Sequence, residues 1–77
     1  MQIEILTADE SIFSGEATIA NFPGKDGSFG VMNDHAPMIA ALKKGNIIVT
    51  TSIGEQTFEV QGGVVEVLKN KVMVLAE

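Results

Sequence analysis

The chain has no cysteine, no arginine, no tryptophan and no tyrosine, and it contains one histidine. Without cysteine it can form neither a disulfide nor a zinc–thiolate site, and it has no thiol for redox chemistry. Five lysines stand against ten carboxylates, which gives a formal net charge of −5 at pH 7. Nucleic-acid binding needs a basic surface that displaces counterions, so this balance argues against a nucleic-acid partner.

Long apolar runs are absent as well. The longest spans seven residues, Ala36–Leu42, whereas a membrane-spanning helix needs about 20. The first residues, Met-Gln-Ile-Glu, lack the basic and apolar regions of a signal peptide. We therefore expect a soluble, cytoplasmic, acidic protein with no segment inserted in a membrane. Its 77 residues fit one small domain, residues 1–77, and a partner that binds the folded state would add stability to it.

What the sequence does contain is a series of short segments rich in valine and isoleucine, separated by eight glycines. Alternation of apolar and polar residues is clearest at Phe58–Gln61, and no window has a sustained helical period. The pattern predicts an all-β fold, a small flattened sandwich or barrel of roughly eight to ten short strands. The expected strands are Gln2–Thr7, Ala17–Phe22, Pro37–Leu42, Asn46–Thr51, Gln56–Gln61, Gly63–Lys69 and Lys71–Ala76, with shorter extended pieces at Ile12–Phe13 and Phe29–Val31.

Three turns can be predicted from residue type. Ser52–Glu55 separates two alternating runs and is expected to form a hairpin tip. Lys69–Lys71 predicts a second hairpin, because Asn70 tolerates a left-handed conformation. Gly62 and Gly63 interrupt a strong strand pattern, which predicts a bulge or sharp bend where the chain changes sheet.

A search for chemistry finds no catalytic or metal-binding constellation. His35 follows Asp34, but neighbours on an extended chain point to opposite faces, so we expect a turn or interface histidine. The glycine-rich stretch Pro23–Gly30 is not a phosphate loop, because its lysine follows the first glycine and no helix comes after it. We expect Gly24, Gly27 and Gly30 to shape a tight loop through positive φ angles, with no nucleotide or other cofactor bound.

Two other function classes remain open at this point. The lysines of the Lys69–Lys71 hairpin allow a lipoyl- or biotinyl-type carrier domain, which is all-β, acidic and of similar size. A small sugar- or peptide-binding sandwich is the other alternative, although sugar sites usually stack tryptophan or tyrosine rings on the ligand. Met38 lies in the apolar run after Pro37, and if exposed it would belong to a protein-binding patch.

Several blocks of the chain resemble one known family. Pro23–Pro37 reads P-G-K-D-G-S-F-G-V-M-N-D-H-A-P, which is similar to the P-G-x-x-G-x-x-G-[IV]-x-x-x-H-A-P signature of the epsilon subunit of F-type ATP synthases. Leu42–Gly45 resembles the family's L-K-x-G, and Phe58–Val67 resembles F-x-V-x-G-G-x-x-E-V. Phe13–Gly15 fits the early F-S-G, and Lys71–Glu77 resembles the closing strand. The blocks occur in family order over nearly the whole chain.

The resemblance implies a non-catalytic part of the rotor's central stalk, bound to the gamma subunit and to the polar loops of the membrane c-ring. It implies coupling of ion-driven rotation to ATP synthesis, at the cytoplasmic face of the bacterial inner membrane. No cofactor is implied for this domain. Relatives usually continue into a C-terminal helical hairpin that carries ATPase inhibition and, in some members, ATP binding, so neither property is carried over to this chain.

The resemblance also suggests contact residues. It assigns Lys25, Asp26, Gly27 and Ser28 to the c-ring, although Ser28 and Asn33 differ from the acidic residue and proline that relatives often have there. For the gamma subunit the assigned residues are Thr7, His35, Ala36, Pro37 and Met38.

Overall fold

The computed structural model describes every residue from Met1 to Glu77 and contains nine strands and no helix. The predicted all-β class is confirmed, and each of the seven longer predicted strands agrees with the structure to within two residues at either end. No helix that could cross a membrane is present. The strands are β1 (Gln2–Leu6), β2 (Ser11–Glu16), β3 (Ile19–Phe22), β4 (Phe29–Met32), β5 (Met38–Leu42), β6 (Gly45–Thr51), β7 (Gly54–Val60), β8 (Gly63–Leu68) and β9 (Lys71–Ala76).

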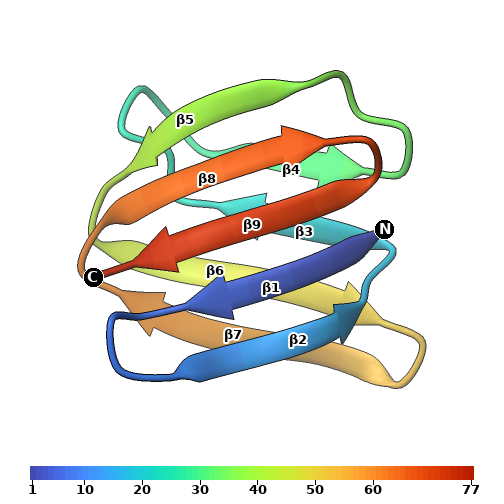
Figure 1. Cartoon of the computed structure of the whole chain (residues 1–77), viewed down its shortest axis with the longest axis horizontal. Coiled ribbons are helices and arrows are strands. Elements are labelled where there is room, and N and C mark those ends of the chain that lie inside the picture. The colour runs from blue at the N-terminus through green and yellow to red at the C-terminus, as the bar shows by residue number, and fades with distance from the viewer.

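The nine strands form two sheets that pack face to face. The five-stranded sheet has the order β2-β1-β9-β8-β5, and the four-stranded sheet has the order β4-β3-β6-β7. In Figure 1 the five-stranded sheet lies in front of the four-stranded sheet. All neighbouring strands are antiparallel except β1 and β9, which run parallel with Ile3 opposite Val72. The expected β-sandwich is confirmed.

The hydrophobic core fills the space between the sheets. Alternate residues of each strand point inward, which is the period of two expected of a sheet with one buried face. Fifteen buried apolar residues form a single cluster, and no buried side-chain nitrogen or oxygen lacks a hydrogen-bond partner. Its fully buried large side chains are Ile3, Ile5, Phe22, Val31, Ile47, Val49, Val60, Val65, Val67, Val72 and Val74.

The predicted turns are present. Lys69 and Asn70 have φ angles of 50° and 61° and join β8 to β9, as expected for a two-residue hairpin whose central residues are both left-handed. Thr51 pairs with Gly54 at the end of the β6–β7 hairpin. Gly63 has a φ of 144° where the chain passes from one sheet to the other. A Cβ atom there would meet the carbonyl oxygen of Leu75, so this position requires glycine.

One predicted extended piece is longer than expected, and the predicted positive φ was wrong for two of the three loop glycines. The short piece at Ile12–Phe13 is part of a six-residue strand, Ser11–Glu16, which pairs with β1. Its polar, largely exposed residues concealed the strand pattern. Of the three loop glycines, Gly27 alone has a positive φ, 132°.

Gly24 and Gly30 have no positive φ and instead lie close to neighbouring atoms, backbone at Gly24 and a side chain at Gly30. A Cβ atom at Gly24 would meet the carbonyl oxygen of Gly27, and one at Gly30 would lie 2.9 Å from Asn21 Oδ1. Sequence alone shows that a glycine is present, but it does not distinguish a special φ from a crowded neighbour.

Candidate interaction surface

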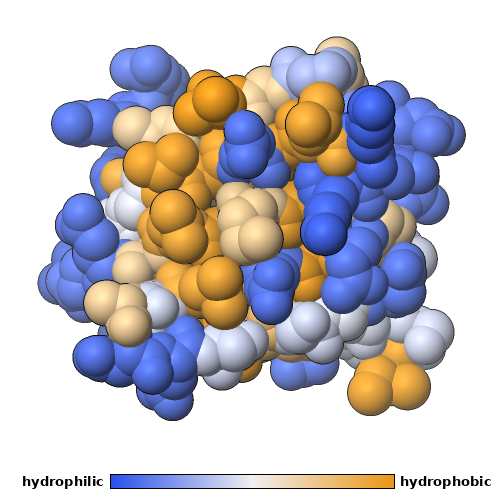
Figure 2. Space-filling model, in the orientation of Figure 1, coloured by the Kyte–Doolittle hydropathy of each residue, from blue (hydrophilic) through white to orange (hydrophobic).

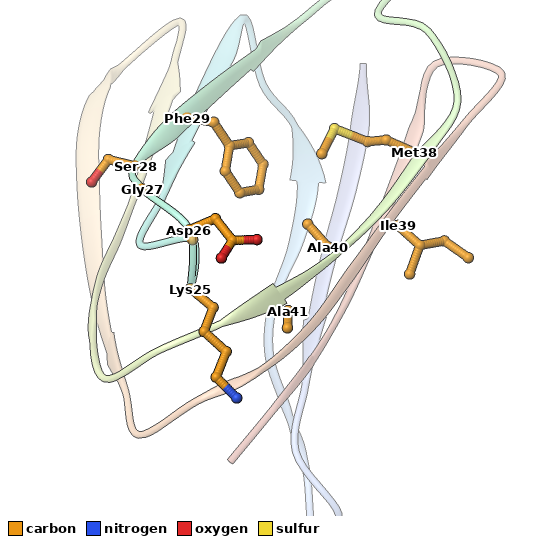
Figure 3. A pocket seen from close by; sticks show the side chains of 10 residues that line it. Lys25, Asp26, Gly27, Ser28, Phe29, Met38, Ile39, Ala40 and Ala41 are labelled. Atoms are coloured by element: carbon orange, nitrogen blue, oxygen red, sulfur yellow. The ribbon is translucent and has the colours of Figure 1, made fainter.

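The Lys25–Ser28 loop and strand β5 line one groove of about 510 Å³. Figure 3 shows Phe29 and Met38 pointing into this space from opposite sides, with Ile39 pointing away from it. The sequence prediction assigned the loop to the c-ring and Met38 to the gamma subunit. The structure places both on the two walls of the same groove.

Backbone hydrogen bonds fix the Lys25–Ser28 loop against β5. The Lys25 N–H donates to the Ala41 carbonyl at 2.9 Å, and the Lys43 N–H donates to the Pro23 carbonyl at 2.9 Å. Within the loop, the Gly27 N–H donates to the Gly24 carbonyl at 3.0 Å. These bonds hold the base of the loop in one position and leave its tip, around Gly27, in open space.

The segment from Asn33 to Pro37 is tied to the β8–β9 hairpin. The Asp34 N–H donates to Asn70 Oδ1 at 2.6 Å, and Asn70 Nδ2 donates to Asp34 Oδ1 at 3.3 Å. Asp34 has a φ of 64°, so the chain turns directly before His35, which agrees with the predicted turn histidine. His35 lies partly buried beside this tie, with its Nδ1 2.7 Å from the Ala36 carbonyl.

The structure separates Thr7 from the other residues assigned to the gamma subunit. Thr7 follows β1, and its hydroxyl oxygen accepts hydrogen bonds from the N–H groups of Asp9 and Glu10 at 3.3 and 3.2 Å. Strand β1 lies three positions from β5 in the sheet. Figure 1 shows the β1–β2 turn at the opposite end of the sheet from the β4–β5 connection that holds His35.

An exposed apolar surface that the sequence analysis did not predict covers the outer side of the five-stranded sheet. Ile39, Val64, Leu68 and Leu75 all point away from the core, and Ile39 and Leu75 are 71% and 57% exposed. We call these four residues the outer apolar face. Val64 pairs directly with Leu75 across β8 and β9. Orange side chains gather over this sheet in Figure 2.

A signal for this face is present in the sequence. Buried Val65, Val67 and Val74 alternate with the outward-pointing Val64, Leu68 and Leu75, so β8 and β9 are apolar on both sides. The alternation predicts the core residues, but it does not assign a role to the outward-pointing set. A shallow hollow of about 350 Å³ also lies on this side of the sheet, between Pro37–Ile39 and Glu66–Leu68.

These features can support contact with a partner. No three histidine, aspartate or glutamate side chains lie together in a way that would hold a metal ion. Contiguous exposed apolar side chains with polar neighbours are typical of protein-binding surfaces. The fold and this surface therefore define the class as a β-sandwich interaction domain.

Comparison with known proteins gives the family. Residues 1–77 match the family described as the ATP synthase Delta/Epsilon chain beta-sandwich domain, and the chain belongs to it. It is 42% identical over 78 residues to the ATP synthase epsilon chain of Stenotrophomonas maltophilia strain K279a, covering 100% of this chain and 56% of that relative. It is 42% identical over 77 residues to the epsilon chain of Chlorobium limicola, covering 99% of this chain and 88% of that relative. The resemblance predicted from sequence is confirmed, and the two alternative classes are set aside.

Solved structures share the fold. A chain of the Euglena gracilis mitochondrial ATP synthase, in a structure of its OSCP/F1/c-ring part, matches with a TM-score of 0.89 at 21% identity, covering 96% of this chain and 48% of that one. A chain of the Tetrahymena thermophila mitochondrial ATP synthase central stalk and c-ring matches with a TM-score of 0.82 at 13% identity, covering 97% and 61%. This chain therefore spans about half the length of several of the relatives it matches.

Proposed function

We propose that this chain is the β-sandwich part of a non-catalytic central-stalk subunit of an F-type ATP synthase. In this role it links the gamma subunit to the c-ring and helps to couple ion-driven rotation to ATP synthesis, at the cytoplasmic face of a bacterial inner membrane. The observation that carries the proposal is the match of the entire chain to the delta/epsilon β-sandwich family. The outer apolar face supports it, because it gives the domain a surface for a protein partner.

The two partners would meet different parts of the surface. We assign the tip of the loop, Lys25 to Ser28, to the c-ring, because it is exposed and its base is anchored on β5. We assign the His35–Met38 segment and the adjoining outer apolar face to the gamma subunit. The hollow formed by Pro37–Ile39 and Glu66–Leu68 makes these two areas continuous.

Thr7 lies apart from the other residues that we assign to the gamma subunit. A gamma subunit that reaches both Thr7 and the His35–Met38 segment must extend across the five-stranded sheet from β5 to β1. The outer apolar face lies along that path, on β5, β8 and β9. Thr7 is therefore expected to contribute at the margin of the contact.

The apolar side chains supply the driving force for this contact. Full burial of an exposed leucine or isoleucine contributes roughly 1.5–3 kcal/mol. Association itself costs at least several kcal/mol of lost freedom, so a few such side chains are needed for a stable complex. Four large apolar residues on one rigid sheet are a suitable set.

Reconstitution tests the proposal. Membranes carrying a bacterial ATP synthase that lacks its epsilon subunit are supplied with this chain, and proton-driven ATP synthesis is measured. We expect the wild-type chain to restore synthesis and Leu68→Asp to fail, because it places a carboxylate in the outer apolar face. Ile53→Asp is the matched control, since Ile53 is 90% exposed on the β6–β7 turn. No recovery with the wild-type chain, or equal recovery with both variants, would contradict the proposal.

A further inference from the structure

Strand β5 has an open edge. It is the last strand of the five-stranded sheet and pairs on one side with β8. Ala41 directs its carbonyl away from β8, to the Lys25 N–H, and Lys43 directs its N–H the same way, to the Pro23 carbonyl. Because backbone groups alternate in direction along a strand, the Ile39 N–H and carbonyl and the Ala41 N–H also point outward. None of these three groups has a backbone partner.

The chain covers this edge only at the Leu42 end. Gly24 forms an isolated antiparallel bridge with Leu42, and the backbone then departs at Asp26–Gly27 to enter β4 in the other sheet. The groove of about 510 Å³ opens at the point of departure. Figure 3 shows the loop and β5 separating on either side of it. A strand inserted there would continue the pairing that Gly24 begins.

The other sheet edges carry features that discourage an added strand. Charged residues, bulges and short length are the usual protections of an edge. Strand β7 carries Glu55 and Glu59, and β2 carries Glu16 and has a register shift against β1. Strand β4 has four residues. The sequence of β5, Met-Ile-Ala-Ala-Leu, has no charged residue.

The side chains around the groove indicate what an added strand would carry. Phe29 and Met38 point into the groove, so inward-facing apolar side chains would pack against them. At the Leu42 end lie Lys25, Lys43 and Lys44, three of the five lysines of the chain. None of them forms an ion pair, since the single ion pair joins the Met1 ammonium to Glu16. Asp26 lines the same groove, so a bound carboxylate is expected beyond it, beside Lys43 and Lys44.

We propose that the free edge of β5 from Ile39 to Ala41 is a strand-addition site. Its ligand is an extended, mainly apolar segment of a partner protein, with acidic residues at the end that meets the three lysines. Main-chain hydrogen bonds supply affinity in this mode of binding, and alternate side chains supply specificity. The inference goes beyond the rotor role, because it specifies a site on the backbone edge of β5. The site adjoins the outer apolar face, to which Ile39 contributes its side chain.

Titration with synthetic peptides tests the site. The probes are acetyl-Glu-Glu-Val-Thr-Val-Thr-Val-amide and its reverse, acetyl-Val-Thr-Val-Thr-Val-Glu-Glu-amide, added to the ¹⁵N-labelled 77-residue chain. We expect one of the two to shift the amide signals of Ile39, Ala41 and the Asp26–Phe29 segment and to slow amide exchange at Ile39 and Ala41. The peptide with lysines in place of both glutamates should bind at least five-fold more weakly. No binding at millimolar concentration, or shifts confined to Leu68 and Leu75, would overturn the proposal.

A proline substitution separates backbone from side-chain contact. Ile39→Pro removes the outward N–H, and proline is tolerated on an edge strand where that group faces solvent. We expect at least a ten-fold loss of peptide affinity, whereas Ile39→Val, which keeps the N–H, should bind within two-fold of the wild type. Equal binding by Ile39→Pro would overturn the proposal. If that variant fails to fold, the slowed exchange at Ile39 and Ala41 in the wild-type chain decides the question in the same way.

The peptide experiment and the reconstitution report on different claims. Peptide binding with failed ATP synthesis would contradict the rotor role and leave the strand-addition site supported. Restored ATP synthesis without peptide binding would support the rotor role and contradict the strand-addition site.

Discussion

The two sides of the five-stranded sheet are made of similar residues but have opposite surroundings. On the inner side, Ile5, Val65 and Val74 are fully buried against the second sheet. On the outer side, Ile39 and Leu75 are exposed, and they are as large and as apolar as their buried neighbours. The comparison shows that apolar residue type does not by itself identify the folding core. One side stabilises the domain, and the other is available to a partner.

Charged residues decide which side faces inward. Glu66 lies between Val65 and Val67 on β8, and Glu4 lies between Ile3 and Ile5 on β1. A register slip by one residue would turn both carboxylates into the core, and burial of an unpaired charge is too costly for the fold to tolerate. The outer side thus has apolar side chains that a partner protein can contact. It also has carboxylates that keep this side of the sheet facing the solvent.

Shortening a buried side chain on the inner side of the sheet should have the largest effect on the free energy of unfolding. Ile5→Ala leaves a cavity in the core and is expected to lower the free energy of unfolding by about 2–5 kcal/mol. That is a large fraction of the total for a domain of this size. Urea denaturation followed by circular dichroism measures it. Leu75→Ala on the outer side is the control and should change stability far less; equal losses would contradict the assignment of the two sides.

Substitution at Gly63, where the chain passes from one sheet to the other, should have the next largest effect on stability. Gly63→Ala combines a positive φ with a contact to the Leu75 carbonyl oxygen, and we expect a loss of about 1–3 kcal/mol. Gly54 has a similar φ of 130°, but no atom lies within 4 Å of the position that a Cβ would occupy there. Gly54→Ala should therefore cost less, and thermal unfolding of the two variants compares them. A smaller loss at Gly63 than at Gly54 would mean that the crowding is unimportant.

The tie between Asp34 and Asn70 should have a moderate effect. Asn70→Ala removes two hydrogen bonds and places alanine at a φ of 61°, with an expected loss of about 1–2 kcal/mol. Asn70→Gly keeps the turn and removes the tie alone, so its loss should be smaller. Amide exchange at Asp34 and His35 should increase in both variants. Unchanged exchange would show that the tie does not hold the segment.

The smallest effect on stability is expected on the outer side. Leu68→Ser and Val64→Thr change side chains that point to solvent, so the free energy of unfolding should stay within about 0.5 kcal/mol of the wild type. Urea denaturation checks this as well. A loss above about 2 kcal/mol for either variant would place that residue in the core and remove it from the interaction surface.

Sequence patterns predicted much of the fold because the relevant signals are local. The alternation at Val65–Val67, the left-handed preference of Asn70 and the paired glycines at Gly62–Gly63 each determine their own conformation. The interaction surface was less predictable, because it depends on contacts between distant segments. The pairing of Lys25 with Ala41 and the tie of Asp34 to Asn70 join residues that no sequence spacing relates.

The central claim is that the inner side of the five-stranded sheet stabilises the fold, and that the outer side is the proposed surface for the gamma subunit. Calorimetric titration of a purified bacterial gamma subunit with this chain tests it most directly, using Leu68→Asp/Leu75→Asp and the control Ile53→Asp. We predict that the control binds like the wild type, whereas the double variant keeps its unfolding midpoint and binds at least ten-fold more weakly. Equal affinity for all three proteins would contradict the claim.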